Sequence, residues 1–449
     1  MEPKQGCSGH FCSENQHKTS LKHRGRKGGY IYNKYRRADF GLRAVGAEGT
    51  YKGISHSLPA SEVQNMPHKI EKNVIFVISM SGIYLHIPFC KRICSYCDFY
   101  RTAALKELPE VVKKMCEEIE QRADYLSDKK IRTRYFGGGT PSLLAPHQIQ
   151  QLLAATERYF DCSEVEETTL EANPDDLTEK YLRELRAMGI NRLSMGIQSF
   201  DDDCLRLMNR RHTAQEAIAA VKRAQDVGFD NITIDLIFGV PGFGGEKLAH
   251  SIHEALKLGV QHISAYLLTI EERTRFGRMV EKGELQEISD EVAEAEYLLM
   301  HKQLTEAGME HYEVSNYALP SYRARHNSSY WDGTPYLGIG PAAHSFDGRS
   351  RQWNVSSVKG YLQGAAPERE ELGEVELREE YLMTRLRTAE GFFMADFEHR
   401  FGTEIAAKIR QKCEKHRQEG LLEIESDKVY IPGEKLLLSD RVIGSLFNL

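Results

Sequence analysis

Short apolar runs rich in β-branched and aromatic residues alternate with longer amphipathic segments along the chain from Ile83 onward. Runs of the first kind predict buried strands, and apolar residues spaced three and four apart predict helices packed on them. The predicted strands are Ile83–His86, Thr133–Phe136, Glu167–Glu171, Arg192–Ile197, Asn231–Phe238 and His262–Leu268. The predicted helices are Leu108–Tyr125, Pro146–Tyr159, Thr178–Met188, Ala214–Val227, Glu246–Leu258 and Ser289–Ala307.

This alternation is typical of α/β proteins with a parallel sheet. Six repeats are too few for a closed eight-stranded barrel, so we expect a partial (β/α)6 barrel whose site lies at the carboxyl ends of the strands. Residues 311–366 are rich in Gly, Asn, Tyr and Pro, and a charged stretch near Pro367–Glu380 indicates a boundary. We therefore expect the barrel over residues 80–310, a distinct segment over 311–366, and a small α/β domain resembling a winged helix over 367–449.

Residues 1–79 differ from the rest of the chain. They hold 13 Lys and Arg against 6 Asp and Glu, a net charge of +7, whereas the remaining residues have a net charge of −13. A basic arm could bind nucleic acid, but no fold for that purpose is recognisable, and we expect no nucleic-acid partner. Asp39, Glu48 and Glu62 argue against a transit peptide. Because Met80 leads directly into the first strand, we expect it to be the natural start and residues 1–79 to be a disordered or non-native extension.

The composition, 41% apolar and 28% charged, is that of an ordinary soluble protein. No apolar run approaches the roughly 20 residues of a membrane span, and no signal-peptide core is present. Nine cysteines in 449 residues are too sparse for a disulfide framework. We therefore expect a reducing, cytoplasmic location.

Three of the cysteines, Cys90, Cys94 and Cys97, have the spacing C-x3-C-x2-C. Three thiolates on one loop can hold three irons of a [4Fe–4S] cluster and leave the fourth iron open to a small molecule. A zinc site would need a second cluster of ligands. The other cysteines are scattered singly, so the spacing favours the iron–sulfur cluster; they are Cys7, Cys12, Cys116, Cys162, Cys204 and Cys413.

Four further groups of residues follow predicted strand ends. Consecutive glycines after the second strand let a backbone approach a ligand closely, and polar side chains after the next three strands could bind hydroxyl or carboxylate groups. Each alone has an ordinary explanation, such as a turn or a solvated charge. The candidates are Gly138, Gly139, Thr140, Glu171, Gln198, Arg210 and Asp235.

The order of these motifs resembles that of the radical S-adenosylmethionine (SAM) proteins. In particular, Y-x-H-I-P-F-C, GGGTP, GIQSF, NR-x-H and DLI-x-G-x-PG resemble the oxygen-independent coproporphyrinogen III oxidases and their relatives. The resemblance covers the chain after residue 80. It implies that the three cysteines hold a [4Fe–4S] cluster and that SAM is bound by the seven candidates above together with Tyr84 and Tyr96.

The same family contains oxidases and HemW-type heme chaperones. The oxidases carry an extra cysteine two residues after the third, where this chain has Phe99. The sequence His326-Asn-Ser-Ser-Tyr330-Trp331 resembles the H-N-x-x-Y-W motif of the chaperones. His326 is therefore the expected heme ligand, although a packed structural histidine is the alternative, and His344 is a second candidate.

The resemblance thus implies a heme chaperone that delivers heme to an acceptor hemoprotein, such as a membrane-bound respiratory one. It also implies an electron donor such as flavodoxin or ferredoxin. The alternative function is coproporphyrinogen III dehydrogenase, a radical SAM enzyme of porphyrin biosynthesis.

Overall fold

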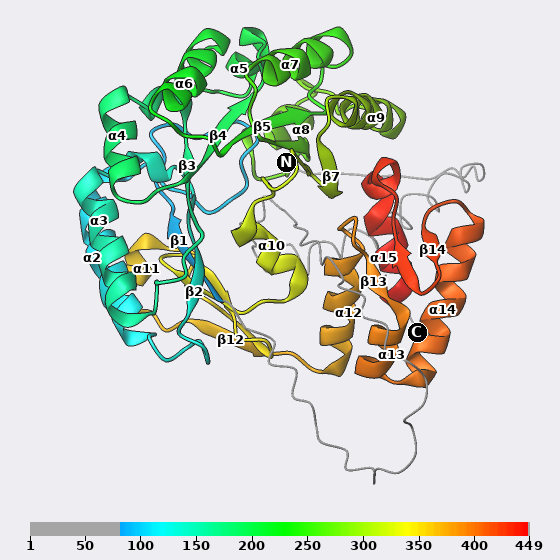
Figure 1. Ribbon diagram of the computed structural model, residues 1–449. Coiled ribbons are helices and arrows are strands. Elements are labelled where there is room, and N and C mark those ends of the chain that lie inside the picture. The colour runs from blue at the N-terminus through cyan, green and yellow to red at the C-terminus, as the bar shows by residue number, and fades with distance from the viewer. Residues whose placement is uncertain (1–80, 448–449) are drawn as a thin grey trace, which may run out of the picture. The chain divides into compact units, whose positions relative to one another are not determined.

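The computed structural model describes residues 81–447, and Figure 1 shows their arrangement. Expectations for residues 1–79 and for Met80 lie outside the described residues. Six parallel strands lie side by side in chain order, with a helix after each of the first five. They are β1 (Ser81–Ile87), β2 (Ile131–Gly138), β3 (Glu167–Ala172), β4 (Arg192–Gln198), β5 (Ile232–Phe238) and β6 (His262–Leu267). The partial α/β barrel expected from the sequence is therefore confirmed.

The helices cover the outside of the strands and bury their apolar faces against them. Thr213 caps α6 by accepting from the N–H of Glu216, whose side chain in turn accepts from the N–H of Thr213, so this helix begins where the sequence predicts. The helices are α2 (Leu108–Gln121), α3 (Pro146–Tyr159), α4 (Glu179–Ala187), α5 (Asp202–Leu207), α6 (Ala214–Asp226), α7 (Glu246–Lys257), α8 (Arg275–Glu281) and α9 (Asp290–Glu306).

Strands from residues 310–371 extend the same sheet at both edges, which the sequence pattern did not indicate. At one edge β8 pairs antiparallel with β6, and at the other β9 pairs parallel with β1. The full order is β12-β11-β10-β9-β1-β2-β3-β4-β5-β6-β8-β7. The added strands are β7 (Glu310–Glu313), β8 (Asn316–Ala318), β9 (Tyr336–Ile339), β10 (His344–Phe346), β11 (Ser350–Trp353) and β12 (Glu368–Glu371).

A second, three-stranded sheet lies near the C-terminus. Its order is β13-β15-β14, and its antiparallel strands together with the surrounding helices give the winged-helix arrangement expected for this part. The elements are α12 (Glu374–Arg385), β13 (Phe392–Phe393), α13 (Met394–Phe401), α14 (Thr403–Gln418), β14 (Glu423–Glu425), β15 (Lys428–Tyr430) and α15 (Ser439–Phe447).

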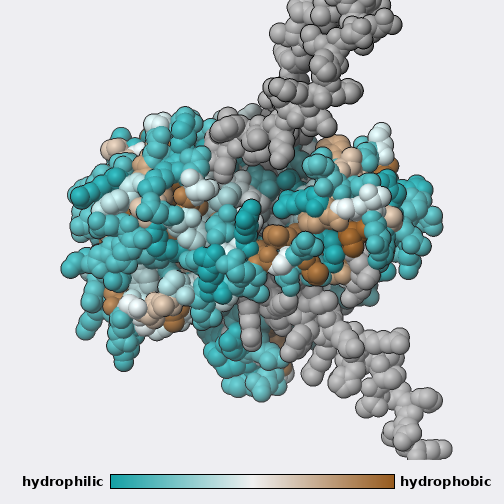
Figure 2. Space-filling model, turned by 90° about the horizontal axis from the view of Figure 1, so that it is seen from below, coloured by the Kyte–Doolittle hydropathy of each residue, from teal (hydrophilic) through white to brown (hydrophobic). Residues whose placement is uncertain are grey.

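On the face that Figure 2 shows, most of the coloured surface is hydrophilic. Figure 2 shows apolar side chains gathered on the side where the C-terminal helices lie. Val375 and Phe393 are exposed large apolar residues of that part of the chain, 48% and 52% exposed. Within residues 81–447, no helix is both long and apolar enough to cross a membrane.

Helix α10 (Arg325–Asp332) closes the end of the barrel at which the strands begin. It packs against β1, β2 and α12. The carboxylate of Glu167, the first residue of β3, accepts the N–H groups of Arg325 and His326 at 2.8 and 2.9 Å. A buried carboxylate thus caps the helix inside the barrel and satisfies two of its unpaired N–H groups.

Candidate functional site

The three closely spaced cysteines lie on the loop that follows β1, at the carboxyl end of the strands. Cys90 is buried, and Cys94 and Cys97 are half-buried; all cysteines in the described residues are free thiols. The N–H of Cys90 donates to the carbonyl of Thr102 at 2.9 Å, and the N–H of Thr102 donates to the carbonyl of Pro88 at 2.7 Å. These two bonds close the base of the loop, so the thiols project from a fixed backbone.

Ser95 anchors the middle of this loop to the opposite side of the barrel. Its N–H and hydroxyl donate to the carbonyls of Met208 and Leu207, at 2.9 and 3.0 Å, and its carbonyl accepts the N–H of Phe276 at 2.9 Å. The cysteine loop is therefore bound to α5 and α8, which follow β4 and β6. This long-range anchoring fixes the positions of Cys94 and Cys97 on either side of Ser95.

Two side chains donate hydrogen bonds to cysteine sulfurs. The hydroxyl of Thr140 lies 3.4 Å from Sγ of Cys90, and a guanidinium nitrogen of Arg210 lies 3.2 Å from Sγ of Cys94. Burial raises the pKa of the Cys90 thiol to about 11, and the Thr140 hydrogen bond opposes that shift. Binding of a metal cluster must therefore displace the Cys90 proton, and both donors would stabilise negative charge on the bound sulfurs.

The glycine loop after β2 comes very close to the cysteine loop. Gly138 has a φ of +107°, which a side chain would strain, and its N–H donates to Glu171 at 3.2 Å. A Cβ on Gly139 would lie 2.8 Å from the carbonyl oxygen of Phe89, so only glycine fits there. The two loops can meet without side chains between them, and they form one wall of a pocket.

Gln198, at the end of β4, combines backbone strain with an unpaired buried atom. Its φ is +74°, and its Oε1 is buried without a hydrogen-bond partner in the described structure. A Cβ on Gly196 would lie 2.8 Å from Nε2 of Gln198, 3.2 Å from Arg210 and 3.8 Å from Asp235. Strain and an unsatisfied amide at a pocket wall are features of a ligand site, because a bound polar group can supply the missing partner.

These loops enclose one pocket, and it brings together most of the residues expected from the sequence. Asp235 is fully buried beneath Gly196, and Tyr84 lies inside the barrel; neither lines the pocket. The expected residues that do line it are Cys90, Cys94, Tyr96, Cys97, Gly138, Gly139, Thr140, Glu171, Gln198 and Arg210, and Phe99 lines it as well.

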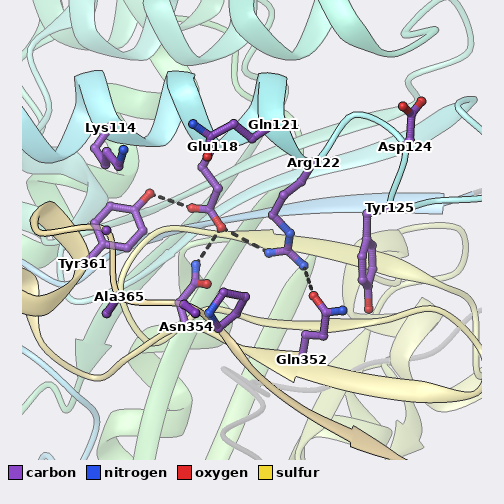
Figure 3. Close-up of a pocket in the computed structure, with 13 residues that line it drawn as sticks. Lys114, Glu118, Gln121, Arg122, Asp124, Tyr125, Gln352, Asn354, Tyr361 and Ala365 are labelled. Carbon is purple, nitrogen blue, oxygen red and sulfur yellow. Dashed lines mark hydrogen bonds and ion pairs between the residues drawn. The ribbon is translucent and has the colours of Figure 1, made fainter.

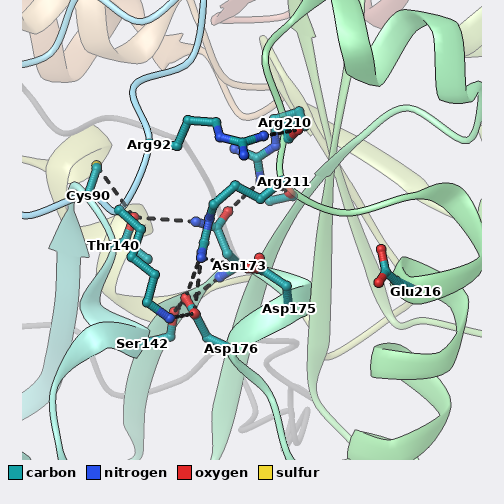
Figure 4. Close-up of polar contacts among 12 residues, drawn as sticks. Cys90, Arg92, Thr140, Ser142, Asn173, Asp175, Asp176, Arg210, Arg211 and Glu216 are labelled. Atoms are coloured by element: carbon teal, nitrogen blue, oxygen red, sulfur yellow. Dashed lines mark hydrogen bonds and ion pairs between the residues drawn. The ribbon is translucent and has the colours of Figure 1, made fainter. Parts of the chain in front are cut away.

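Asp176 is the centre of an ion-pair network beside this pocket that the sequence reading missed (Figure 4). Its side chain, only 2% exposed, accepts from Lys91 at 2.6 Å, Arg211 at 3.1 Å and Ser142 at 2.9 Å. The three donors come from the cysteine loop, the segment after α5 and the segment after the glycine loop. Two adjacent acidic residues after the Asn-Pro turn of β3, Asp175 and Asp176, were the available signal, but such residues are mostly exposed and solvated, so they did not stand out.

His326, the expected heme ligand, is fully buried at the other end of the barrel. Its Nδ1 lies 2.8 Å from the hydroxyl of Thr133 and its Nε2 lies 2.9 Å from the hydroxyl of Tyr330. Burial lowers the pKa of His326 to about 3, so its ring is neutral. With both ring nitrogens engaged, His326 in this arrangement does not fit an axial heme ligand. To bind iron, His326 would have to lose one of these hydrogen bonds and move out of its buried position.

The second candidate, His344, lies on β10 and is also buried. Its ring stacks on Trp353 with centroids 5.9 Å apart, and its Nδ1 has no hydrogen-bond partner among the described residues. Burial lowers the pKa of His344 to about 3. Neither histidine lines the pocket at the cysteine loop.

A second pocket lies outside the barrel, between α2, the end of β11 and residues 361–367 (Figure 3). Glu118 is buried there and accepts from Arg122 at 3.1 Å, Asn354 at 2.7 Å and Tyr361 at 2.6 Å. Arg122 in turn donates to Gln352 at 3.2 Å. These charges are neutralised by protein partners, so the pocket is a polar junction that fastens the added strands to α2.

Comparisons with known proteins agree with this site. The model of the radical SAM superfamily matches residues 84–255, and that of the HemN C-terminal domain matches residues 374–434. The fold is similar to that of the Escherichia coli coproporphyrinogen III oxidase HemN, with a TM-score of 0.69 and 23% identity over 82% of this chain and 90% of that one. The chain is thus a radical SAM protein, a class whose cofactors are a [4Fe–4S] cluster and SAM.

Relatives with higher sequence identity show which family within this class the chain belongs to. The heme chaperone HemW of Bacillus subtilis is 33% identical over 377 residues, covering 82% of this chain and 100% of that protein. HemW of Mycobacterium tuberculosis (strain H37Rv) is 35% identical over 377 residues, covering 82% of this chain and 95% of that protein. The chain therefore belongs to the HemW family.

Proposed function

We propose that this protein is a heme chaperone, which binds heme and transfers it to an acceptor hemoprotein. The observation that carries the proposal is the match with proteins named heme chaperones along 82% of this chain and the whole of one relative. Phe99 supports it, because an aromatic side chain lines the pocket where the related oxidases carry a cysteine. An acceptor in a respiratory membrane complex and a flavodoxin or ferredoxin as electron donor belong to the same proposal.

The pocket at the cysteine loop would hold the resident cofactors. Cys90, Cys94 and Cys97 would ligate three irons of the cluster, and the cluster would supply an open iron for the amino and carboxylate groups of SAM. The glycine N–H groups and Arg210 would orient those groups. Glu171 and Gln198 would bind the ribose and adenine side, with Tyr96 and Thr140 completing the lining; the unpaired Oε1 of Gln198 favours this assignment. Asp235 and Tyr84, also expected from the sequence to bind SAM, lie behind the lining and would support it from there.

The heme ligand in this proposal is His326. Its neutral ring is the ligating form of histidine, and Tyr330 and Trp331 on the same helix would offer apolar ring faces to a macrocycle. Because both ring nitrogens of His326 are engaged, we propose that ligation follows release of α10 from the barrel end.

The test is anaerobic reconstitution of the full chain followed by titration with heme, monitored by the Soret band. We expect stoichiometric heme binding, a shifted Soret band in His326→Ala, and no conversion of coproporphyrinogen III in the presence of SAM and a reductant. Tyr317→Phe is the matched control, because the Tyr317 hydroxyl is buried and has no hydrogen-bond partner in the described structure. Conversion of coproporphyrinogen III without retained heme would assign the protein to the dehydrogenases instead.

A further inference from the structure

A continuous column of side chains inside the barrel joins the two functional regions. At one end the ring of His326 stacks on that of Tyr135, with centroids 5.1 Å apart and planes at 23°. At the other end the hydroxyl of Tyr135 donates to Oε1 of Glu171 at 2.9 Å. The second carboxylate oxygen of Glu171 accepts the N–H of Gly138 at 3.2 Å. Tyr135 therefore touches helix α10 with its ring and the pocket wall with its hydroxyl.

The packing around the column leaves little space for alternative side-chain positions. A Cβ on Gly137 would lie 2.8 Å from the ring of Tyr135 and 2.9 Å from that of Tyr84, and a Cβ on Gly82 would lie 3.1 Å from the ring of His326. Tyr84 stacks beside Tyr135 with centroids 6.0 Å apart. Gly82 and Gly137 thus leave no spare room beside the rings, and loss of the His326 ring would remove the support on one side of Tyr135.

We propose that Tyr135 is a positioning residue that ties the Glu171 carboxylate of the SAM pocket to His326 on helix α10. In the arrangement seen here, in which α10 closes the barrel, His326 packs against Tyr135 and Tyr135 holds Glu171 in place for SAM. Iron ligation by His326 needs one of its ring nitrogens released, which removes that support. SAM and heme would therefore each favour a different position of α10, so that each weakens the binding of the other.

The positioning of Glu171 by Tyr135 can be tested without heme. In the heme-free, cluster-reconstituted full chain, SAM affinity is measured from the change that SAM causes in the electron paramagnetic resonance signal of the reduced cluster. We expect Tyr135→Phe to raise the Kd for SAM roughly tenfold, because it removes a donor to a charged carboxylate while keeping the ring. Tyr317→Phe, which removes a buried hydroxyl without a partner, should leave the Kd unchanged.

A double-mutant cycle separates positioning from general loss of stability. His326→Ala and Tyr135→Phe should each raise the Kd for SAM by some factor. If His326 acts through Tyr135, the double variant should raise the Kd by less than the product of the two single factors. A Tyr135→Phe chain with wild-type SAM affinity, or strictly independent effects in the cycle, would overturn the inference whether or not the protein carries heme.

The coupling between SAM binding and heme binding rests on the proposed function. Heme is titrated with and without saturating SAM, and we expect SAM to weaken heme binding by at least fivefold in the wild type and by less than twofold in Tyr135→Phe. Heme binding that SAM does not change would overturn the coupling and leave the chaperone function intact. Absence of heme binding would remove the proposed function and the coupling, while the positioning role of Tyr135 would still be decided by the SAM measurements.

Discussion

At the scale of single residues, two side chains of the pocket donate hydrogen bonds to cysteine sulfurs. Thr140 and Arg210 come from loops after β2 and α5, yet both reach cysteines of one short loop. Hydrogen bonds to ligand sulfurs stabilise the more negative, reduced form of an iron–sulfur cluster. Thr140, expected from the sequence only as a possible contact of SAM, thus also has a geometric role toward Cys90.

We predict that Thr140→Val makes the reduction potential of the cluster more negative. A hydrogen bond with a net strength of about 1 kcal/mol corresponds to roughly 40 mV for a one-electron couple. The measurement is a redox titration of the reconstituted chain followed by electron paramagnetic resonance. Thr169→Val is the matched control, because the buried Thr169 hydroxyl has no partner in the described structure. An equal potential in the Thr140 and Thr169 variants would contradict a bond to the ligated sulfur.

At the scale of elements, helix α10 closes the barrel and depends on a cap from another element. The N–H groups of Arg325 and His326 both bond to Glu167, which belongs to β3 and is separated from them by more than 150 residues. Ala324 at the N-cap position offers no side-chain acceptor. The start of this helix is therefore set by tertiary contact and not by its own sequence.

We predict that Glu167→Ala destabilises the protein by about 2–4 kcal/mol, because it leaves two buried N–H groups unpaired. The free energy of unfolding is measured by urea denaturation. Glu164→Gln removes an exposed ion pair with Lys130 and should change stability by less than about 1 kcal/mol. Similar losses in the two variants would show that Glu167 does not cap α10.

The six central strands could be predicted because each is a compact apolar run followed by an amphipathic helix of ordinary length. The pocket residues were placed by the rule that parallel strands end at one edge of the sheet. The short strands β7–β12 and the position of α10 could not be predicted, since strands of three or four residues carry no usable period and their pairing is long-range. His326 shows the consequence: its motif was visible, but its burial beneath Tyr135 follows only from the folded barrel.

At the scale of the whole molecule, several histidines are buried in neutral form. Burial lowers their pKa values to about 4 for His86 and His212 and to about 3 for His311, His326 and His344. In the unfolded chain the same groups take up protons near pH 6.5. The unfolded state thus binds more protons below that pH, and stability falls as the pH drops from about 6.5 toward about 4.

Glu313, on β7, has the opposite effect. Burial raises its pKa to about 8, so the folded state keeps a proton that the unfolded state releases above about pH 4.5. Its contribution to stability is therefore lost as the pH rises toward 8. Among these six groups of the described residues, the five histidines outweigh the one glutamate below pH 6.5, and Glu313 alone acts between pH 7 and 8. The two slopes together predict a stability maximum near neutral pH.

We predict that the free energy of unfolding decreases between pH 6.5 and 5 by up to about 5 kcal/mol per pH unit, because roughly four net protons are taken up. Urea denaturation at a series of pH values measures this slope. His311→Phe should reduce the slope by about 1.4 kcal/mol per pH unit, since a phenyl ring can keep the stack on Tyr317 and does not titrate. His253→Gln, at an exposed position, is the matched control. If both variants retained the wild-type slope, proton uptake by His311 would not contribute to acid unfolding, and the loss of stability would have to arise from the carboxylates.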